Sequence, residues 1–245
     1  MIILASDTST SLGSVALRGP EGIVLRENLD RDKPHSETLL PAVERILIRA
    51  GVTRKDVQAI AVGTGPGAFT GLRVGLATFK AWAAASGLPL IPVTSMDAVA
   101  WPLLKEGSSV VVLADARKGE VYAAYYPFLE DGALPRRQGE VMLIPHDRVS
   151  DWIVSLKDPG ARMVGTGLSL LEEKGLLDGL EKVGGGSGEP DAVWVLALAE
   201  IFFSLGRTVD PSGLIPCYVR PPDAEKPSPG KIVTSKPDIG DPSHS

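Results

Sequence analysis

The first thirty residues alternate between short apolar runs and turn-forming residues, a pattern typical of a small antiparallel meander. Apolar residues dominate positions 2–6, 15–18 and 23–25. Residues 19–22 read Gly-Pro-Glu-Gly, which is the composition of a tight turn. We therefore predict three antiparallel strands at the start of the chain.

The spacing of apolar residues then changes to that of a helix. Steps of 1, 3, 3, 1 and 3 place six residues on one helical face: Leu39, Leu40, Val43, Ile46, Leu47 and Ala50. Gly51 ends the predicted helix. With Thr38 as the N-cap, Pro41 falls at the third helical position, where its missing N–H would have no intrahelical acceptor.

The elements that follow repeat part of this order. We predict strands at 57–62 and 90–93 and helices at 70–86 and 95–104; Gly87 ends the first helix and Pro102 interrupts the second. The order to this point is βββαβαβα. Strands at 110–114, 121–126, 141–144 and 163–165, with a helix at 147–156, then form an incomplete second copy. A strongly apolar helix is predicted at 191–205.

This order sets the predicted domains. Residues 1–106 form a first lobe, and residues 107–220 form a reduced second lobe that includes a glycine-rich loop at 184–188. Residues 221–245 contain six prolines and no aromatic residue. We expect an extended or flexible tail there, with no fold of its own.

The charge balance argues against several classes of function. The 245 residues carry 25 Lys and Arg against 30 Asp and Glu, a net charge of −5, whereas proteins that bind nucleic acid unaided usually present a basic face. We therefore expect no tight, independent binding to RNA, DNA or an anionic membrane. A single cysteine, no basic leader and no apolar run of about 20 residues favour a cytoplasmic protein.

A glycine-rich turn formally matches a cofactor fingerprint. Residues 63–68 read Gly-Thr-Gly-Pro-Gly-Ala, which fits G-x-G-x-x-A between a predicted strand and helix. However, no Asp or Glu ends the following strand to hold a ribose, and no Gly-Lys-Ser/Thr completes a P-loop. A turn that needs glycine for its shape is the better interpretation.

The residues for metal or nucleophilic chemistry are few and scattered. His35, His146 and His244 share no metal-binding spacing with one another or with Cys217. No Gly-x-Ser-x-Gly elbow exists, and we expect Cys217 to be a small buried hydrophobe. The sequence thus predicts no catalytic and no metal-ligating residue.

Two acidic hairpins are the remaining candidates for a nucleotide site. Residues 7–10 read Asp-Thr-Ser-Thr, and residues 115–120 read Asp-Ala-Arg-Lys-Gly-Glu at the equivalent hairpin of the second copy. An acidic residue followed by hydroxyls can hold a metal-bound phosphate, although a simple Asx or Ser turn explains the pattern equally well. The candidates are Asp7, Thr8, Thr10, Asp115 and Gly119.

The helix predicted at 70–86 is rich in small residues that let another backbone approach closely. Gly71, Gly75 and Thr78 lie at i, i+4 and i+7 on this helix. Two uses stay open. The small residues either pack inside the protein or form a seam with another chain, and different faces can serve each use.

Five strings, taken in order over about the first 220 residues, resemble the bacterial TsaB (YeaZ) family. They are Asp-Thr-Ser-Thr at 7–10, His-Ser-Glu-x-Leu-Leu-Pro at 35–41, Gly-Pro-Gly-x-Phe-Thr-Gly-Leu-Arg at 65–73, Asp-Ala-Arg-Lys-Gly-Glu-Val-Tyr at 115–122 and Tyr-Val-Arg at 218–220. The resemblance implies an α/β, actin/Hsp70-like (ASKHA) fold of two lobes with mixed sheets and a reduced second lobe. It also implies a role in making threonylcarbamoyladenosine next to the tRNA anticodon, with the catalytic paralogue TsaD and the ATPase TsaE.

The same resemblance argues against catalysis by this chain. TsaD holds its metal with two histidines at i, i+4 after the strand that is here 90–93, and Ser95 and Val99 stand at those positions. Neither side chain is a usual metal ligand. Kinship with proteins once labelled M22 glycoproteases therefore gives no reason to expect proteolysis.

We therefore expect a scaffolding subunit that binds and activates a TsaD-like transferase together with a TsaE-like ATPase. A homodimer is a further possibility, and tRNA is expected to be contacted only through the complex. Isolated chain is expected to bind nucleotide weakly or not at all, with ATP and a metal held by the partners. The alternative is a free-standing ATPase or kinase of the actin-like superfamily. The resemblance suggests a four-helix bundle with the partner, for which the candidates are Leu39, Leu40, Val43, Ile46, Leu47, Gly71, Gly75 and Thr78.

Overall fold

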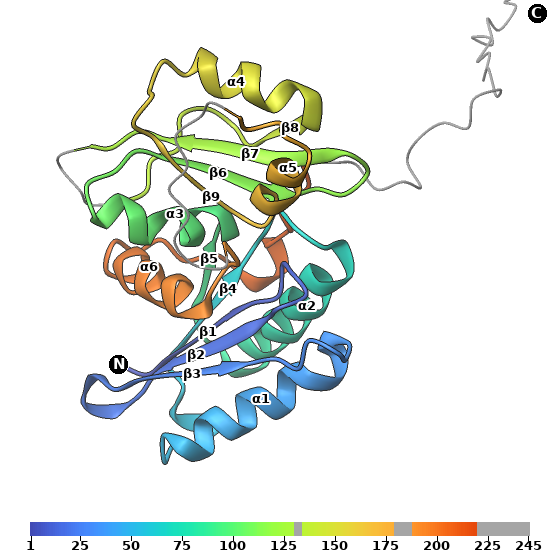
Figure 1. The fold of residues 1–245 in the computed structure, drawn as a ribbon. Coiled ribbons are helices and arrows are strands. Elements are labelled where there is room, and N and C mark those ends of the chain that lie inside the picture. Colours follow the sequence, from blue (N-terminus) through green and yellow to red (C-terminus); the bar gives the residue numbers. More distant parts are fainter. Residues whose placement is uncertain (130–133, 179–187, 220–245) are drawn as a thin grey trace, which may run out of the picture.

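Two mixed β-sheets, one in each lobe, organise the chain (Figure 1). The computed structural model describes residues 1–129, 134–178 and 188–219. Sheet A has the order β3-β2-β1-β4-β5 and consists of β1 (Ile3–Asp7), β2 (Ser14–Arg18), β3 (Val24–Asn28), β4 (Ala59–Gly63) and β5 (Leu90–Val93). The first three strands are antiparallel, and β1, β4 and β5 are parallel. The predicted meander is confirmed.

Both faces of sheet A are covered by helices because its strands are buried on both sides. Helices α1 (His35–Arg49) and α2 (Phe69–Ser86) pack on one face, and α3 (Ser95–Lys105) and α6 (Ala192–Ser204) pack on the other. Figure 1 shows α1 below the sheet and α6 above it. Gly87 ends α2 with a left-handed φ of 63°, which glycine adopts without strain, as predicted.

Sheet B forms the second lobe with the order β8-β7-β6-β9. Its strands are β6 (Val110–Asp115), β7 (Glu120–Tyr126), β8 (Met142–Pro145) and β9 (Arg162–Val164). Helices α4 (Val149–Ser155) and α5 (Leu168–Glu173) cover its outer face, and α3 covers its inner face. Because α3 contributes to the cores of both lobes, it joins the two sheets.

The start of α1 differs from the prediction. The helix begins at His35 with Pro34 as its N-cap, and Thr38 lies within the first turns and donates its hydroxyl to the Pro34 carbonyl at 3.3 Å. The prediction of Thr38 as N-cap is therefore wrong. Pro41 is inside the helix and exposed, where its ring faces solvent. The fixed φ of Pro34 suits a helix start, so Pro34 rather than Pro41 marks the beginning of this helix.

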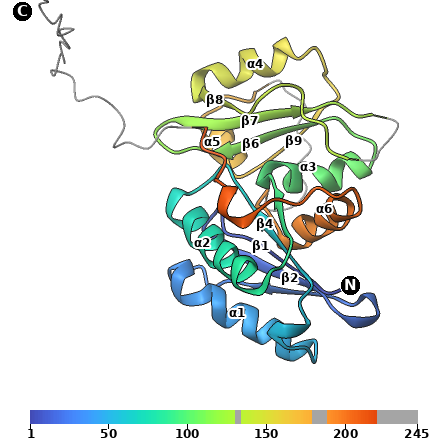
Figure 2. The ribbon, with the colours of Figure 1, turned by 180° about the vertical axis from the view of Figure 1, so that it is seen from behind.

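The extent of the second lobe also needs correction. Helix α6, which lies within the range 107–220 assigned to that lobe, packs on sheet A. The chain after α6 stays with the first lobe, since Val209 N–H donates to Leu90 O at 2.9 Å and Leu214 is buried in the core beneath α1 and α2. Figure 2 shows this orange segment beside α2. An apolar helix from the end of the chain thus covers a sheet face that residues 1–106 leave incomplete.

Smaller differences concern short elements. Helix α5 was not predicted, and the described residues include four 3-10 turns, at Pro20–Gly22, Arg54–Asp56, His146–Arg148 and Pro211–Gly213. The predicted tail at 221–245 and most of the glycine-rich loop at 184–188 lie outside the described residues. Within the described ranges, no helix has the length and apolar character needed to cross a membrane.

Candidate functional site

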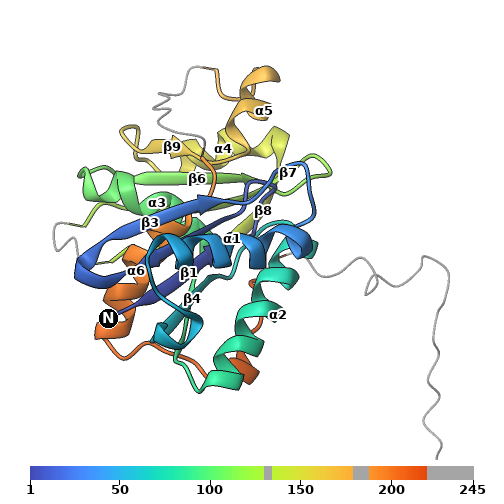
Figure 3. The same ribbon diagram turned by 90° about the horizontal axis from the view of Figure 1, so that it is seen from below.

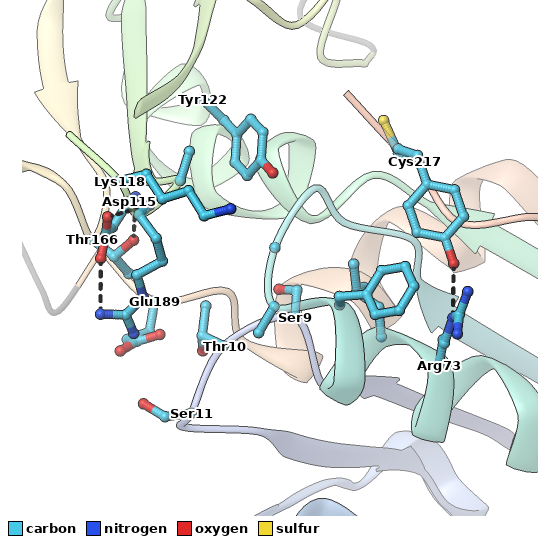
Figure 4. Close-up of a pocket in the computed structure, with 17 residues that line it drawn as sticks. Ser9, Thr10, Ser11, Arg73, Asp115, Lys118, Tyr122, Thr166, Glu189 and Cys217 are labelled. Atoms are coloured by element: carbon cyan, nitrogen blue, oxygen red, sulfur yellow. Dashed lines mark hydrogen bonds and ion pairs between the residues drawn. The ribbon is translucent and has the colours of Figure 1, made fainter. Parts of the chain in front are cut away.

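A cleft of about 750 Å³ lies between the lobes (Figure 4). The first lobe contributes the β1–β2 hairpin at residues 9–11 and the N-terminal end of α2. The second lobe contributes the β6–β7 hairpin at 115–118 together with Tyr122 and Thr166. Glu189 and the last described segment, through Cys217 and Tyr218, complete the lining. The two predicted hairpins therefore do meet at one cleft.

Asp7 does not reach this cleft. Its carboxylate is buried, where Oδ1 accepts hydrogen bonds from Ser9 N–H (2.8 Å) and Ser9 Oγ, and Oδ2 accepts from Ser95 Oγ at 2.6 Å. Burial raises the pKa of Asp7, and the hydrogen bonds from Ser9 and Ser95 oppose that rise. The hydrogen bond from Ser9 N–H to Asp7 Oδ1 fits the Asx-turn interpretation. The bond from Ser95 also ties this hairpin to α3.

Thr8 is also turned inward. Its hydroxyl donates to Gly71 O at 2.9 Å, and a Cβ added at Gly75 would overlap Thr8 Oγ1. A Cβ at Gly71 would overlap the Thr8 carbonyl. The glycines of α2 thus serve close packing within the first lobe, and their assignment to an outer, partner-binding seam is wrong.

Thr10 and Asp115 are the nucleotide-site candidates that line the cleft. The ring of His35 donates through Nε2 to Thr10 O at 2.7 Å, which holds the first hairpin against the start of α1. Asp115 accepts from Arg117 N–H at 2.8 Å and pairs with its guanidinium at 3.2 Å. Gly119 provides the left-handed φ of 79° at the end of this turn and is not part of the lining.

The predicted partner residues divide between core and surface. Leu39, Val43, Ile46 and Leu47 are buried against sheet A, so these four partner candidates face the core of their own lobe rather than a partner. Leu40 is 49% exposed and Thr78 is half-buried. A helix that covers a sheet must bury its main apolar stripe, which leaves a narrower outward strip for any partner.

A cluster of side chains at the cleft rim was not among the predicted site residues. Arg73 lies over the ring of Phe69, 3.7 Å from its centroid, and donates through Nε to Tyr218 Oη at 3.3 Å. The Phe69 and Tyr218 rings are 5.5 Å apart. Phe69, Arg73 and Tyr218 belong to two of the strings that resemble the TsaB family, and this membership could have pointed to them in the sequence. Cys217 beside them is half-buried rather than buried, and burial raises the pKa of its thiol.

Local contacts account for His35, His146 and the glycine-rich turn. Among the described residues no group of three His, Cys, Asp or Glu side chains has a metal-binding arrangement. His146 Nδ1 lies 3.0 Å from Lys174 Nζ. His35 is distant from His146 in the sequence. In the G-x-G-x-x-A turn, Cβ atoms at Gly63 and Gly67 would overlap Asp7 and Ser9, so packing explains these small residues.

Comparison with known proteins identifies the family. A family model named TsaD, tRNA N6-adenosine threonylcarbamoyltransferase, matches residues 27–133. The tRNA threonylcarbamoyladenosine biosynthesis protein TsaB of Escherichia coli is 34% identical over 240 residues, which cover 94% of this chain and all of that protein. The chain belongs to the TsaB family. TsaB of Haemophilus influenzae is 31% identical over 94% of this chain and 98% of that protein.

Solved structures agree with the TsaB assignment. YeaZ from Pseudomonas aeruginosa has a TM-score of 0.75 at 32% identity, covering 89% of this chain and 99% of that chain. A second structure, described as an uncharacterized protein with similarity to peptidase YEAZ from the same organism, has a TM-score of 0.76 at 33% identity. The predicted actin/Hsp70-like, two-lobed α/β fold is thereby confirmed.

Proposed function

We propose that this TsaB-family chain takes part in tRNA threonylcarbamoyladenosine biosynthesis as a non-catalytic subunit that binds and activates a TsaD-like transferase, with a TsaE-like ATPase. The relatives that match nearly the whole chain carry the name of this biosynthesis. The shared pathway name, together with the match of residues 27–133 to the TsaD family model, suggests a TsaD-like protein as the partner.

The observation that carries the non-catalytic role is the use of two positions on α3. By resemblance, Ser95 and Val99 stand where TsaD has its metal-binding histidines. Ser95 is buried, donates to Asp7 and accepts from Gly65 N–H at 3.0 Å. Val99 is packed in the core between α3 and sheet B. Both positions therefore serve the fold, and neither presents a ligand to the cleft.

The partner surface we propose is the outward side of α1 and α2. Leu40 and Ile48 lie two turns apart on α1 and are 49% and 72% exposed. Ala77 and Ala81, one turn apart on α2, are exposed and small. Figure 3 shows α1 and α2 adjacent, with no other element over α1. Exposed aliphatic residues beside a flat alanine face suit helix-to-helix packing with a TsaD-like chain or with a second copy.

ATP and the metal are proposed to reside on the partner subunits, and tRNA to be contacted through the complex in the cytoplasm. Asp7 and Thr8 are occupied by internal hydrogen bonds, which removes half of a hairpin phosphate site. The net charge of −5 provides no surplus of cations for independent tRNA binding.

Reconstitution tests this function against the free-standing kinase or ATPase. Purified chain, TsaD-like enzyme, TsaE-like ATPase, threonylcarbamoyl-adenylate, ATP and tRNA should together form the modified nucleoside, and omission of this chain should abolish or strongly reduce its formation. The isolated chain should show neither modification nor ATP hydrolysis. Steady ATP turnover by the chain alone would favour the kinase class and overturn the proposal.

A further inference from the structure

A segment between β7 and β8 crosses the junction of the two lobes. At one end of it, Leu134 packs against the apolar cluster that α3 and α6 form on sheet A. Further along, Gln138 N–H donates to Tyr125 O on sheet B at 2.9 Å, and Val141 is buried between α3 and sheet B. Residues 134–141 are therefore attached to both lobes, and we call them the strap.

Helix α3 is the joint that the strap crosses. Figure 1 shows α3 between sheet B and α6, and its side chains belong to the cores of both lobes. Apolar packing has no preferred direction, so it opposes separation of the lobes more than their rotation. Contacts with a defined direction must then fix the angle between the lobes. Arg162 on β9 pairs with Glu106 at the end of α3, but Glu106 is 60% exposed, and exposed ion pairs contribute little.

Asp97, in the first turn of α3, makes a better protected contact of this kind. Its Oδ1 accepts the hydroxyl of Tyr126 at 2.7 Å, and Tyr126 is the fully buried last residue of β7. A terminal nitrogen of Arg137, on the strap, lies 3.9 Å from the same oxygen. Arg137 also donates through Nε to Gly139 O at 3.0 Å, which holds its side chain against the strap. One carboxylate thus joins α3 to sheet B and to the strap.

The contact depends on the charges of both Asp97 and Arg137. Burial raises the pKa of Asp97, and the hydroxyl of Tyr126 and the charge of Arg137 oppose that rise. A second carboxylate near Arg137, that of Glu140 at 3.6 Å, is 96% exposed and holds the guanidinium weakly. A buried carboxylate that loses its cation is strongly disfavoured, so Asp97 and Arg137 act as a pair.

These charges also lie close to the cleft. Burial raises the pKa of the Cys217 thiol, which lines the cleft, and the positive charge of Arg137 opposes this rise. The charges of Glu140 and Asp97 add to it. Tyr122, a further residue of the cleft lining, packs in the cluster between α3 and sheet B. A change at the strap would therefore reach the cleft wall.

We propose that Asp97, Tyr126 and Arg137 hold the strap across the lobe junction and thereby fix the opening of the cleft. Without this contact, the second lobe could rotate on α3 and the cleft could adopt a range of openings. The inference concerns the isolated chain and is independent of the proposed role with a TsaD-like enzyme.

Distances between the lobes in the isolated full-length chain test the proposal. Spin labels at Lys55→Cys in the first lobe and Val154→Cys on α4 are read by pulsed EPR in a Cys217→Ser background; both labelled positions are exposed. The unaltered contact should give a single narrow distance distribution. Arg137→Gln and Asp97→Asn should each shift or broaden it by about 2 Å or more, the scale of domain rearrangements. The double variant should have no larger effect than Asp97→Asn, because the two residues act as a pair.

Matched variants separate this role from a general loss of stability. Arg45→Ala breaks an ion pair with Glu27 inside the first lobe and should leave the distribution unchanged. Arg137→Lys keeps the positive charge and should resemble the unaltered chain more than Arg137→Gln does. Melting temperatures show which variants are folded. Arg137→Gln decides the question if Asp97→Asn does not fold, because Arg137 lies on a surface segment rather than in a core helix. A folded Arg137→Gln variant with the unaltered distribution would overturn the proposal, as would an equal change in Arg45→Ala.

Discussion

Asp7 is buried at the end of β1 and receives hydrogen bonds from both the backbone and hydroxyl of Ser9 and from Ser95. The position joins the first hairpin to α3, which itself joins the two lobes. The carboxylate therefore acts on the geometry of the cleft without contacting its contents.

The raised pKa of Asp7 predicts a pH-dependent stability. Between about pH 4, where an unfolded carboxyl group titrates, and the higher pKa of folded Asp7, the folded state binds more protons than the unfolded state. The free energy of unfolding should therefore fall as pH rises through this interval. Asp7→Asn is neutral throughout and should lose that contribution, so its stability relative to the natural chain should increase with pH.

Urea unfolding at a series of pH values measures this difference. Asp97, whose pKa burial also raises, is present in both proteins and cancels in the comparison. Parallel pH profiles for the two proteins would contradict the prediction. As a control, Asp7→Ala leaves Ser9 and Ser95 without their acceptor and should cost about 1–3 kcal/mol.

Gly75 provides a second prediction at this scale. A Cβ there overlaps the hydroxyl of Thr8, so Gly75→Ala should destabilise the isolated chain by about 1–3 kcal/mol through overpacking. Thermal unfolding measures the loss. The exposed Ala81→Ser on the same helix is the control and should leave the melting temperature nearly unchanged. An unaltered melting temperature for Gly75→Ala would contradict the internal packing role of Gly75 and make it a candidate for the partner surface again.

The residue types at both hairpins were visible in the sequence, but their orientation was not. Thr10 and Asp115 line the cleft, whereas Asp7 and Thr8 face α2 and α3. Which way each side chain turns depends on helices that follow some 60 to 90 residues later in the chain. No local spacing encodes that packing.

At the scale of elements, α1 has one stripe for the core and another for solvent. Periodicity correctly predicted a helix here, yet it grouped Leu40 with its buried neighbours. Spacing alone does not show which residues of an apolar stripe are buried and which are exposed. In the structure, sheet A covers Leu39 and Val43, which are buried, whereas Leu40 and Ile48 are exposed to solvent.

This division predicts opposite effects for neighbouring leucines. Leu40→Glu combined with Ile48→Glu should leave the melting temperature nearly unchanged and weaken association with a TsaD-like protein by tenfold or more, because burial of a charge in an apolar interface costs well over about 1.4 kcal/mol. Leu39→Ala should instead destabilise the monomer by about 2–5 kcal/mol. Calorimetric titration and thermal unfolding separate the two effects.

A distant exposed residue serves as the control for association. Val154 on α4 is 65% exposed in the second lobe, and Val154→Glu should leave partner affinity unchanged. Full affinity in the Leu40 and Ile48 double variant would remove the outer side of α1 from the interface.

At the scale of the whole molecule, the two lobes are not consecutive halves of the chain. The order of strands and helices in the first lobe was predictable because each element has a clear period and a glycine or proline at its end. The return of α6 to sheet A was not, since an all-apolar helix carries no sign of which sheet it covers. Ion pairs from Arg18 to Glu200 and from Arg26 to Asp191 add to that docking.

This arrangement predicts that residues 1–106 do not fold alone. Without α6, one face of sheet A exposes strand residues that are fully buried in the whole chain, among them Ile3, Ala5 and Ala16. The fragment should show no cooperative thermal transition and should aggregate. Co-expression with residues 188–245 should restore a soluble, cooperatively melting pair more effectively than co-expression with 107–187. Cooperative melting of the fragment 1–106 by itself would contradict the claim that the first lobe needs α6.

In the proposed function, this chain activates a TsaD-like transferase and is not itself the catalyst. The most direct measurement holds a TsaD-like enzyme, its TsaE-like ATPase and substrates at fixed concentration and follows the initial rate of tRNA threonylcarbamoylation as this chain is added. We predict a rate that rises, saturates once the TsaD-like enzyme is fully bound, and has a plateau proportional to the concentration of that enzyme. A rate that keeps rising in proportion to this chain, or that persists when the TsaD-like enzyme is left out, would contradict the account.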